Sequence, residues 1–185
     1  APGVMNYLGG RPSISSSVKL FSFLLSKDYF DVSVNIDEDK TPVSIINDPQ
    51  TQIYTGADYA VLGKNLNERL DKETKLINLA YVRSGDKGDH ANIGVIARKP
   101  DFLRYIKHSL TIERLQSHFS HVLNGSIHCW EVPGINGLNF LLQNSLGGGG
   151  MASLNIDPQG KAYAQQIIDF KIAVPEFIYN EVHKK

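Results

Sequence analysis

Two apolar segments, residues 75–82 and 93–97, flank a polar stretch at residues 83–92, and this arrangement constrains the fold more than any other feature. Both segments are apolar enough to form buried strands. Nine of the ten residues between them are polar or glycine, and Ala91 is the exception. Because a hairpin connection needs only about two to five residues, we predict a longer loop here between two buried strands.

The chain after residue 97 predicts alternating helices and strands. Pro100 lies where a first helical residue is expected, and Thr111 can cap a helix with Leu115 and Phe119 on its apolar face. Further elements are expected as a strand at residues 126–132, a helix at 134–146 ending at Gly147, a short strand at 151–156, a helix opened by Asp157-Pro158 and a strand at 170–174. This order is typical of an α+β sandwich with helices on one face of its sheet.

The N-terminal part shows a different pattern. Residues 18–25 and 30–36 are rich in Phe, Leu and Val, and we predict that they pair as two strands with exposed apolar area. Such an apolar patch would favour self-association. Residues 47–74 are polar, lack apolar periodicity and predict a linker.

Composition narrows the range of partners. The chain has 19 Lys plus Arg and 19 Asp plus Glu, so no global charge attracts it to nucleic acid or an anionic membrane. Its longest apolar runs are far shorter than the roughly 20 residues of a membrane-spanning helix. Cys129 is the only cysteine, which favours a reducing compartment, and we expect a cytoplasmic location without nucleic-acid or membrane partners.

The polar stretch 83–92 carries the clearest chemical signal. Gly85 and Gly88 allow backbone amides to converge on an anion, with positive charge from Arg83 and Lys87 nearby. The acidic residues of the stretch, together with His90, can transfer a proton or orient a cation. The alternative interpretation is an ordered turn in which the aspartates cap backbone amides.

Other candidates have simpler explanations as well. Residues 147–150 are four glycines that allow close backbone approach to a ligand, but they also suit a helix end followed by a flexible connection. Asn139 can serve a site or tie an element to a loop. The spacing of His118, His121 and Cys129 matches no compact zinc pattern, so we predict no metal site.

Several ordered motifs support a more specific assignment. They are residues 83–94 (RSGDKGDHANIG), Pro133-Gly134, residues 138–142 (LNFLL), 146–150 (LGGGG) and 157–161 (DPQGK). Together they resemble the acyclic terpene utilisation (AtuA) family over roughly residues 75–175. The resemblance implies a ferredoxin-like C-terminal domain with a mostly antiparallel sheet, and a link to acyclic terpenoid catabolism through branched acyl-CoA compounds. It names no cofactor.

The resemblance also implies a domain order. The stretch from Gly10 to Phe23 resembles the end of the large N-terminal domain of full-length AtuA proteins. We therefore expect a tail of that domain with its strand-pair remnant at residues 1–46, a linker at 47–74, the ferredoxin-like domain at 75–175 and a C-terminal tail at 176–185. The missing N-terminal domain and a second copy of the chain are the expected protein partners.

The residue types and the family resemblance together define the candidate site. We predict Asp86, Lys87 and Asp89 as catalytic residues. The predicted ligand-binding residues are Arg83, Ser84, Gly85, Gly88, Asn92, Asn139, Gly147, Gly148, Gly149 and Gly150, in two loops that share a pocket for a small molecule such as an acyl-CoA. The competing hypothesis is a non-catalytic structural or oligomerisation module, in which the polar groups of the loops satisfy one another.

Overall fold

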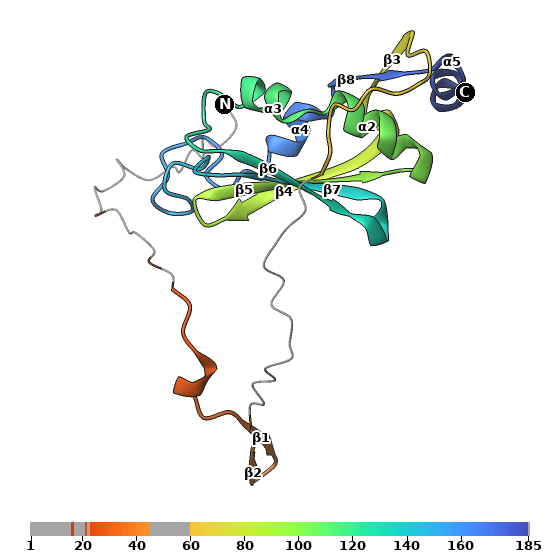
Figure 1. Ribbon diagram of the computed structural model, residues 1–185. Coiled ribbons are helices and arrows are strands. Elements are labelled where there is room, and N and C mark those ends of the chain that lie inside the picture. Colours follow the sequence, from red (N-terminus) through yellow and green to blue (C-terminus); the bar gives the residue numbers. More distant parts are fainter. Residues whose placement is uncertain (1–15, 17–20, 22, 45–59, 185) are drawn as a thin grey trace, which may run out of the picture. The chain divides into compact units, whose positions relative to one another are not determined.

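The computed structural model describes residues 16, 21, 23–44 and 60–184 (Figure 1). The described residues fall into two compact units, residues 21 and 23–44 in one and residues 60–184 in the other. In these described residues, no helix is both long enough and apolar enough to cross a membrane.

The smaller unit contains a short β-hairpin. A single 3₁₀ turn, η1 (Lys27–Tyr29), precedes strands β1 (Ser33–Ile36) and β2 (Asp39–Pro42), which pair antiparallel. The predicted pairing of residues 18–25 with 30–36 is therefore wrong where it can be followed, since residues 23–26 form no strand. Residues 18–20 and 22 lie outside the described part. The partner of β1 is the polar segment directly after it, because a two-residue turn closes a hairpin at far lower entropic cost than a longer loop.

The larger unit is built around a four-stranded antiparallel sheet. Its strands are β4 (Ala80–Lys87), β5 (His90–Ala97), β6 (Ile127–Val132) and β7 (Gly137–Leu142), in the order β4-β5-β7-β6. One side-chain face is apolar and buried, with Ile93, Val95, Leu138 and Phe140 at its centre. Alternation along each strand sends the polar side chains to the opposite face.

Helices cover the apolar face of this sheet (Figure 1). A 3₁₀ turn, η2 (Pro100–Phe102), leads into α2 (Leu103–Ser109), and α3 (Ile112–His118) and α4 (Tyr163–Ile167) complete the layer. The expected cap of α3 is present, because the Thr111 side chain accepts a hydrogen bond from the Arg114 amide. The prediction of an α+β sandwich with helices on one face of an antiparallel sheet is confirmed.

A second, smaller sheet extends the unit. Strands β3 (Lys72–Lys75) and β8 (Lys171–Val174) pair antiparallel, β8 contacts α2, and α5 (Glu176–His183) contacts β3. Strand β3, apart from Lys75, thus falls inside the stretch that the sequence predicts as a linker, and α5 falls inside the predicted tail. Ala60, Leu62, Leu66 and Leu70 also pack against the main core, and Ile178 of α5 is part of it.

Four secondary-structure predictions differ from the structure. The predicted strand at 75–82 begins as one helical turn, α1 (Leu76–Leu79), and the predicted strand at 151–156 consists of turns and coil. The predicted helix at 134–146 is a 3₁₀ turn, η3 (Pro133–Ile135), followed by the central strand β7. The last predicted helix does not start at Asp157, although its carboxylate accepts the amides of Lys161 and Ala162 just before α4.

Candidate functional site

The polar stretch 83–92 is a tight hairpin and not the long loop predicted from its composition. Strands β4 and β5 continue through it until Lys87 pairs with His90, so only Gly88 and Asp89 form the turn. Gly88 has a φ of 67°, which suits glycine at this position. The stretch is polar because strands covered on one face only can carry polar side chains on the other.

A group of polar and small residues shares that second face at the free edge of the sheet. Arg83, Gly85 and Lys87 alternate along β4 on this face. Gly85 pairs with Asn92 of β5, and Arg83 pairs with Gly94. The two glycines contribute no side chain, so the backbone forms a floor between the cationic residues.

Lys161, from the segment before α4, completes this group. The Ser84 hydroxyl, on the helix-covered face, donates to the Lys161 carbonyl at 3.2 Å and accepts from the Ala164 amide at 2.9 Å. Asp157 fixes the same segment, since its Oδ1 accepts the Lys161 amide at 3.0 Å. The Lys161 Nζ reaches the edge of β4, 3.6 Å from Asp86 Oδ1 and 3.1 Å from the place where a Cβ on Gly85 would lie.

These residues enclose an open hollow of about 400 Å³. Its lining consists of Arg83, Ser84, Gly85, Asp86, Lys87, Asn92, Gly94 and Lys161. Three of the side chains are cationic and one is a carboxylate, so the lining carries a net positive charge. Six of the predicted site residues therefore come together here, while Lys161 was not among them even though it belongs to the 157–161 motif.

Asn92 links the hollow to the middle of the sheet. The Lys87 ammonium group donates to Asn92 Oδ1 at 3.3 Å and to the Asp86 carbonyl at 3.0 Å. Asn92 Nδ2 in turn donates to Asn139 Oδ1 on β7 at 3.2 Å. Asn139 thus orients a residue of the hollow without lining it.

The four glycines and the hairpin turn pack against each other. Gly148 N donates to Asp89 Oδ1 at 2.6 Å, and the amides of Ser145 and Leu146 both donate to the Asp89 carbonyl. A Cβ on Gly149 would lie 2.7 Å from the carbonyl carbon of Gly88. The two predicted loops are therefore adjacent, but Gly88, Asp89 and residues 147–150 are not among the residues that line the hollow.

His90, Cys129 and His118 occupy structural environments. His90 Nδ1 accepts the Asn144 amide at 2.9 Å. Burial raises the pKa of the Cys129 thiol to about 12, so the thiol is a poor nucleophile near neutral pH. The His118 ring packs edge-on against Phe119 and Phe170. Among the described residues, no group of three or more His, Cys, Asp or Glu side chains is arranged to hold a metal ion.

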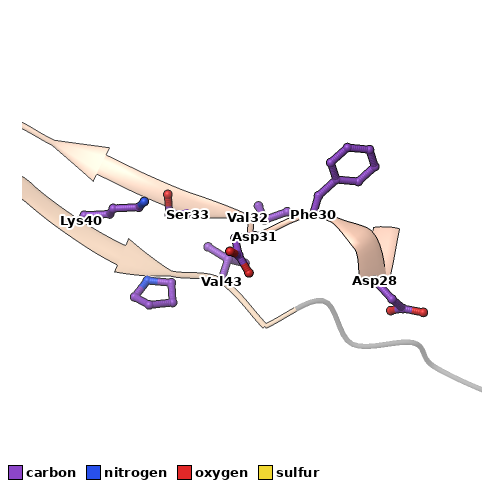
Figure 2. Close-up of a pocket in the computed structure, with 8 residues that line it drawn as sticks. Asp28, Phe30, Asp31, Val32, Ser33, Lys40 and Val43 are labelled. Atoms are coloured by element: carbon purple, nitrogen blue, oxygen red, sulfur yellow. The ribbon is translucent and has the colours of Figure 1, made fainter. Parts of the chain in front are cut away.

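The hairpin of the smaller unit has a hollow of its own, of about 440 Å³ (Figure 2). Its lining includes Val32, Ser33, Lys40 and Val43 of the hairpin, and Asp28 and Phe30 from the segment before it. Two four-residue strands do not provide a core that would hold such a hollow rigidly. It is a weaker candidate for ligand binding than the hollow beside β4, whose backbone belongs to the main sheet.

Comparison with known families decides the assignment of the larger unit. The profile of the AtuA ferredoxin-like domain matches residues 74–173. The chain belongs to this family. The matched region of the AtuA ferredoxin-like domain runs from β3 to β8 and includes every residue that lines the hollow beside β4. Searches of curated proteins and of solved structures gave no significant match.

Proposed function

We propose that the AtuA ferredoxin-like domain binds the anionic group of a small molecule in the hollow beside β4. The main support is the convergence of three cationic side chains from two distant segments: Arg83 and Lys87 from β4 and Lys161 from the segment before α4. Arg83 and Lys87 are four residues apart on β4, which corresponds to about 13 Å along the strand. Lys161 Nζ lies near Gly85, between these two cations. Such a row attracts an extended or multiply charged anion.

Part of the lining is held in place by hydrogen bonds within the domain. Hydrogen bonds of Ser84 and Asp157 fix the backbone of Lys161, and Lys87 is oriented by Asn92. Preorganised charges cost less entropy on binding than free side chains. The exposed backbone at Gly85 and Gly94 leaves room for the ligand to lie close to the sheet.

Family membership suggests which anions to consider. In line with the resemblance to terpene utilisation proteins, we propose an acyl-CoA, or the branched acid that it carries, as the ligand. Both offer phosphate or carboxylate oxygens for Lys87, Lys161 and the Arg83 guanidinium group. Asp86 and Lys87 are the proposed acid–base groups, because both line the hollow. The Asp89 carboxylate already accepts the Gly148 amide, so Asp89 is the weakest of the three proposed catalytic residues.

A structural role is the second candidate, and the contacts of Asp89 favour it for part of the site. The carbonyl and carboxylate of Asp89 accept amides from residues 145, 146 and 148, which is the mutual satisfaction expected of an architectural turn. In that case the domain supports the N-terminal domain of a longer protein or pairs two copies of the chain. The turn can have this role while the hollow beside it still binds an anion.

Titrations of the 185-residue chain distinguish the two functions. Inorganic phosphate, coenzyme A and geranate would be added to isotope-labelled protein while the backbone amides are followed by NMR. We expect the largest shifts at Gly85, Gly94 and Lys161, and a binding constant that falls as salt rises, because exposed charges are screened.

Lysine substitutions supply the control. Lys161→Met and Lys87→Met should each weaken binding about fivefold, corresponding to about 1 kcal/mol for an exposed charge contact. Lys171→Met removes an exposed lysine of β8 outside the hollow and should leave binding unchanged. Absence of shifts with all three ligands, or equal loss of binding in all three variants, would exclude the proposed function.

A further inference from the structure

We propose that the hollow beside β4 selects anions that carry a hydroxyl group near the charge, with Asp86 as the acceptor of that hydroxyl. The ligand class is hydroxylated carboxylates or phosphate esters. This inference rests on the proposed anion binding and adds a selectivity that the cations alone do not provide.

The carboxylate of Asp86 has unused acceptor capacity inside a cationic site. Its Oδ1 lies 3.6 Å from Lys161 Nζ, and the Asp86 side chain is 41% exposed. Among the described residues, none donates a hydrogen bond to Oδ2. A ligand in the hollow can therefore reach this oxygen as well as the cations.

A carboxylate in an anion-binding hollow reduces the affinity for a plain anion, because like charges a few ångströms apart repel each other. The loss is offset when the ligand donates a hydrogen bond to the same carboxylate, since hydrogen bonds to charged groups are stronger than neutral ones. Selectivity then arises from repulsion of the wrong ligand and attraction of the right one.

The charge of the lining favours a hydroxyl over an ammonium group as the donor. Arg83, Lys87 and Lys161 against Asp86 leave a net charge of +2. A ligand ammonium group would approach all three cations, whereas a hydroxyl donates its proton without adding positive charge. The hydroxyl is the donor that satisfies Asp86 and leaves the cations to the anion.

The geometry limits the distance between the two ligand groups. Lys161 Nζ lies 3.6 Å from Oδ1 of the Asp86 carboxylate, so a ligand oxygen bound to Lys161 and a hydroxyl bound to either carboxylate oxygen lie about 3–6 Å from one another. A hydroxyl three bonds from the carboxylate carbon, or three bonds from the ester oxygen that joins a phosphate to the ligand, meets this requirement. 3-Hydroxybutyrate and glycerol 3-phosphate are small representatives of the two chemistries.

The test uses two matched pairs, 3-hydroxybutyrate with butyrate and glycerol 3-phosphate with propyl phosphate, titrated into the 185-residue protein. We expect the hydroxylated member of at least one pair to bind at least fivefold more tightly. Preference in the carboxylate pair alone, or in the phosphate pair alone, supports the inference and identifies the anion.

Variants connect the preference to Asp86. In Asp86→Ala the preference should fall to about onefold while the plain anion binds more tightly, because the repulsion is gone. In Lys87→Met all four ligands should weaken by a similar factor and the preference should persist. If circular dichroism shows that the alanine variant is not folded, Asp86→Asn replaces it, with a tighter plain anion and a smaller preference expected.

The outcomes distinguish anion binding from selectivity for a hydroxyl group. If none of the four ligands binds, the proposed anion site is wrong. If they bind without preference in the wild type, or if the preference survives removal of the Asp86 carboxylate, anion binding stands and the selectivity proposal is overturned.

Discussion

Gly149→Ala and Gly150→Ala form a matched pair that tests how the four-glycine segment packs. Both residues have positive φ, 71° and 43°, so alanine meets the same kind of backbone strain at each position. That strain costs about 1 kcal/mol per substitution. The surroundings differ, because a Cβ on Gly149 would lie 2.7 Å from the carbonyl carbon of Gly88, while a Cβ on Gly150 would have no atom within 4 Å.

The steric overlap sets the expected difference. The Gly88 carbonyl belongs to the β4–β5 turn, so the overlap is relieved only by moving backbone, at a further cost of about 1–3 kcal/mol. Both variants also lose the flexibility of glycine in the unfolded chain, and this contribution cancels in the comparison. We therefore expect Gly149→Ala to be less stable than Gly150→Ala by about 2 kcal/mol.

Urea denaturation and thermal melting measure the difference. At about 3 °C per kcal/mol for a domain of this size, Gly149→Ala should melt about 6 °C below Gly150→Ala. Hydrogen exchange should show that the Gly148 amide, which donates to Asp89, loses protection in Gly149→Ala only. Equal melting temperatures, with equal exchange at this amide, would refute the packing of the glycines against the hairpin turn.

One labelling experiment and two further variants probe the rest of the larger unit. Burial raises the pKa of the Cys129 thiol to about 12, so we expect iodoacetamide at pH 8 to label it only under unfolding conditions; rapid labelling of the native protein would contradict this environment. Burial and then the charge of Asp157 raise the pKa of Tyr163 to about 12, and its hydroxyl donates to the Ser145 carbonyl at 2.7 Å. The stabilisation from protonated Tyr163 should be complete below its ordinary pKa of 10 and lost towards pH 12. Tyr163→Phe should therefore reduce the loss of folding stability at alkaline pH, as measured by urea denaturation. An unchanged pH profile would contradict this role of the Tyr163 hydroxyl. Asp157→Ala should cost about 1 kcal/mol, because the amides of Lys161 and Ala162 lose the carboxylate that accepts them. The variant should also weaken anion binding, since Lys161 loses its anchor. Unaltered phosphate affinity in the NMR titration would separate the cap from the site.

The predicted helix at 134–146 shows why local patterns failed. Leu138, Leu141 and Leu142 have helical spacing, but Leu138, Phe140 and Leu142 also alternate as in a strand. The structure buries the second set, with β5 and β6 hydrogen-bonded on either side of β7. Those pairings supply the backbone partners of a central strand, and periodicity within the segment contains no information about them.

The polar stretch 83–92 was misread for a related reason. Polar residues were expected in a loop, yet Arg83, Gly85 and Lys87 continue β4 on the sheet face that no helix of residues 60–184 covers. Such a strand needs apolar side chains on one face only, and Ala91 and Ile93 supply them on the neighbouring strand. The chemistry of the stretch was predictable from its residue types, whereas its conformation depended on which face the helices cover.

The sequence by itself determined the α+β class, the family, the cap of α3 and the cationic and glycine content of the candidate site, because these depend on residue types and short spacings. Only the tertiary structure brought Lys161 to the edge of β4. The Ser84 hydroxyl holds a backbone 77 residues later in the chain, and Asp157 fixes the same turn. The tertiary structure also assigned Asp89 to the glycine segment and Asp86 to the hollow, although the two residues are three apart in sequence. Neighbouring residues of similar chemistry have different surroundings because strand side chains alternate between two faces of the sheet, while turn residues lie beyond its end. The packing of distant segments decides which groups each residue contacts.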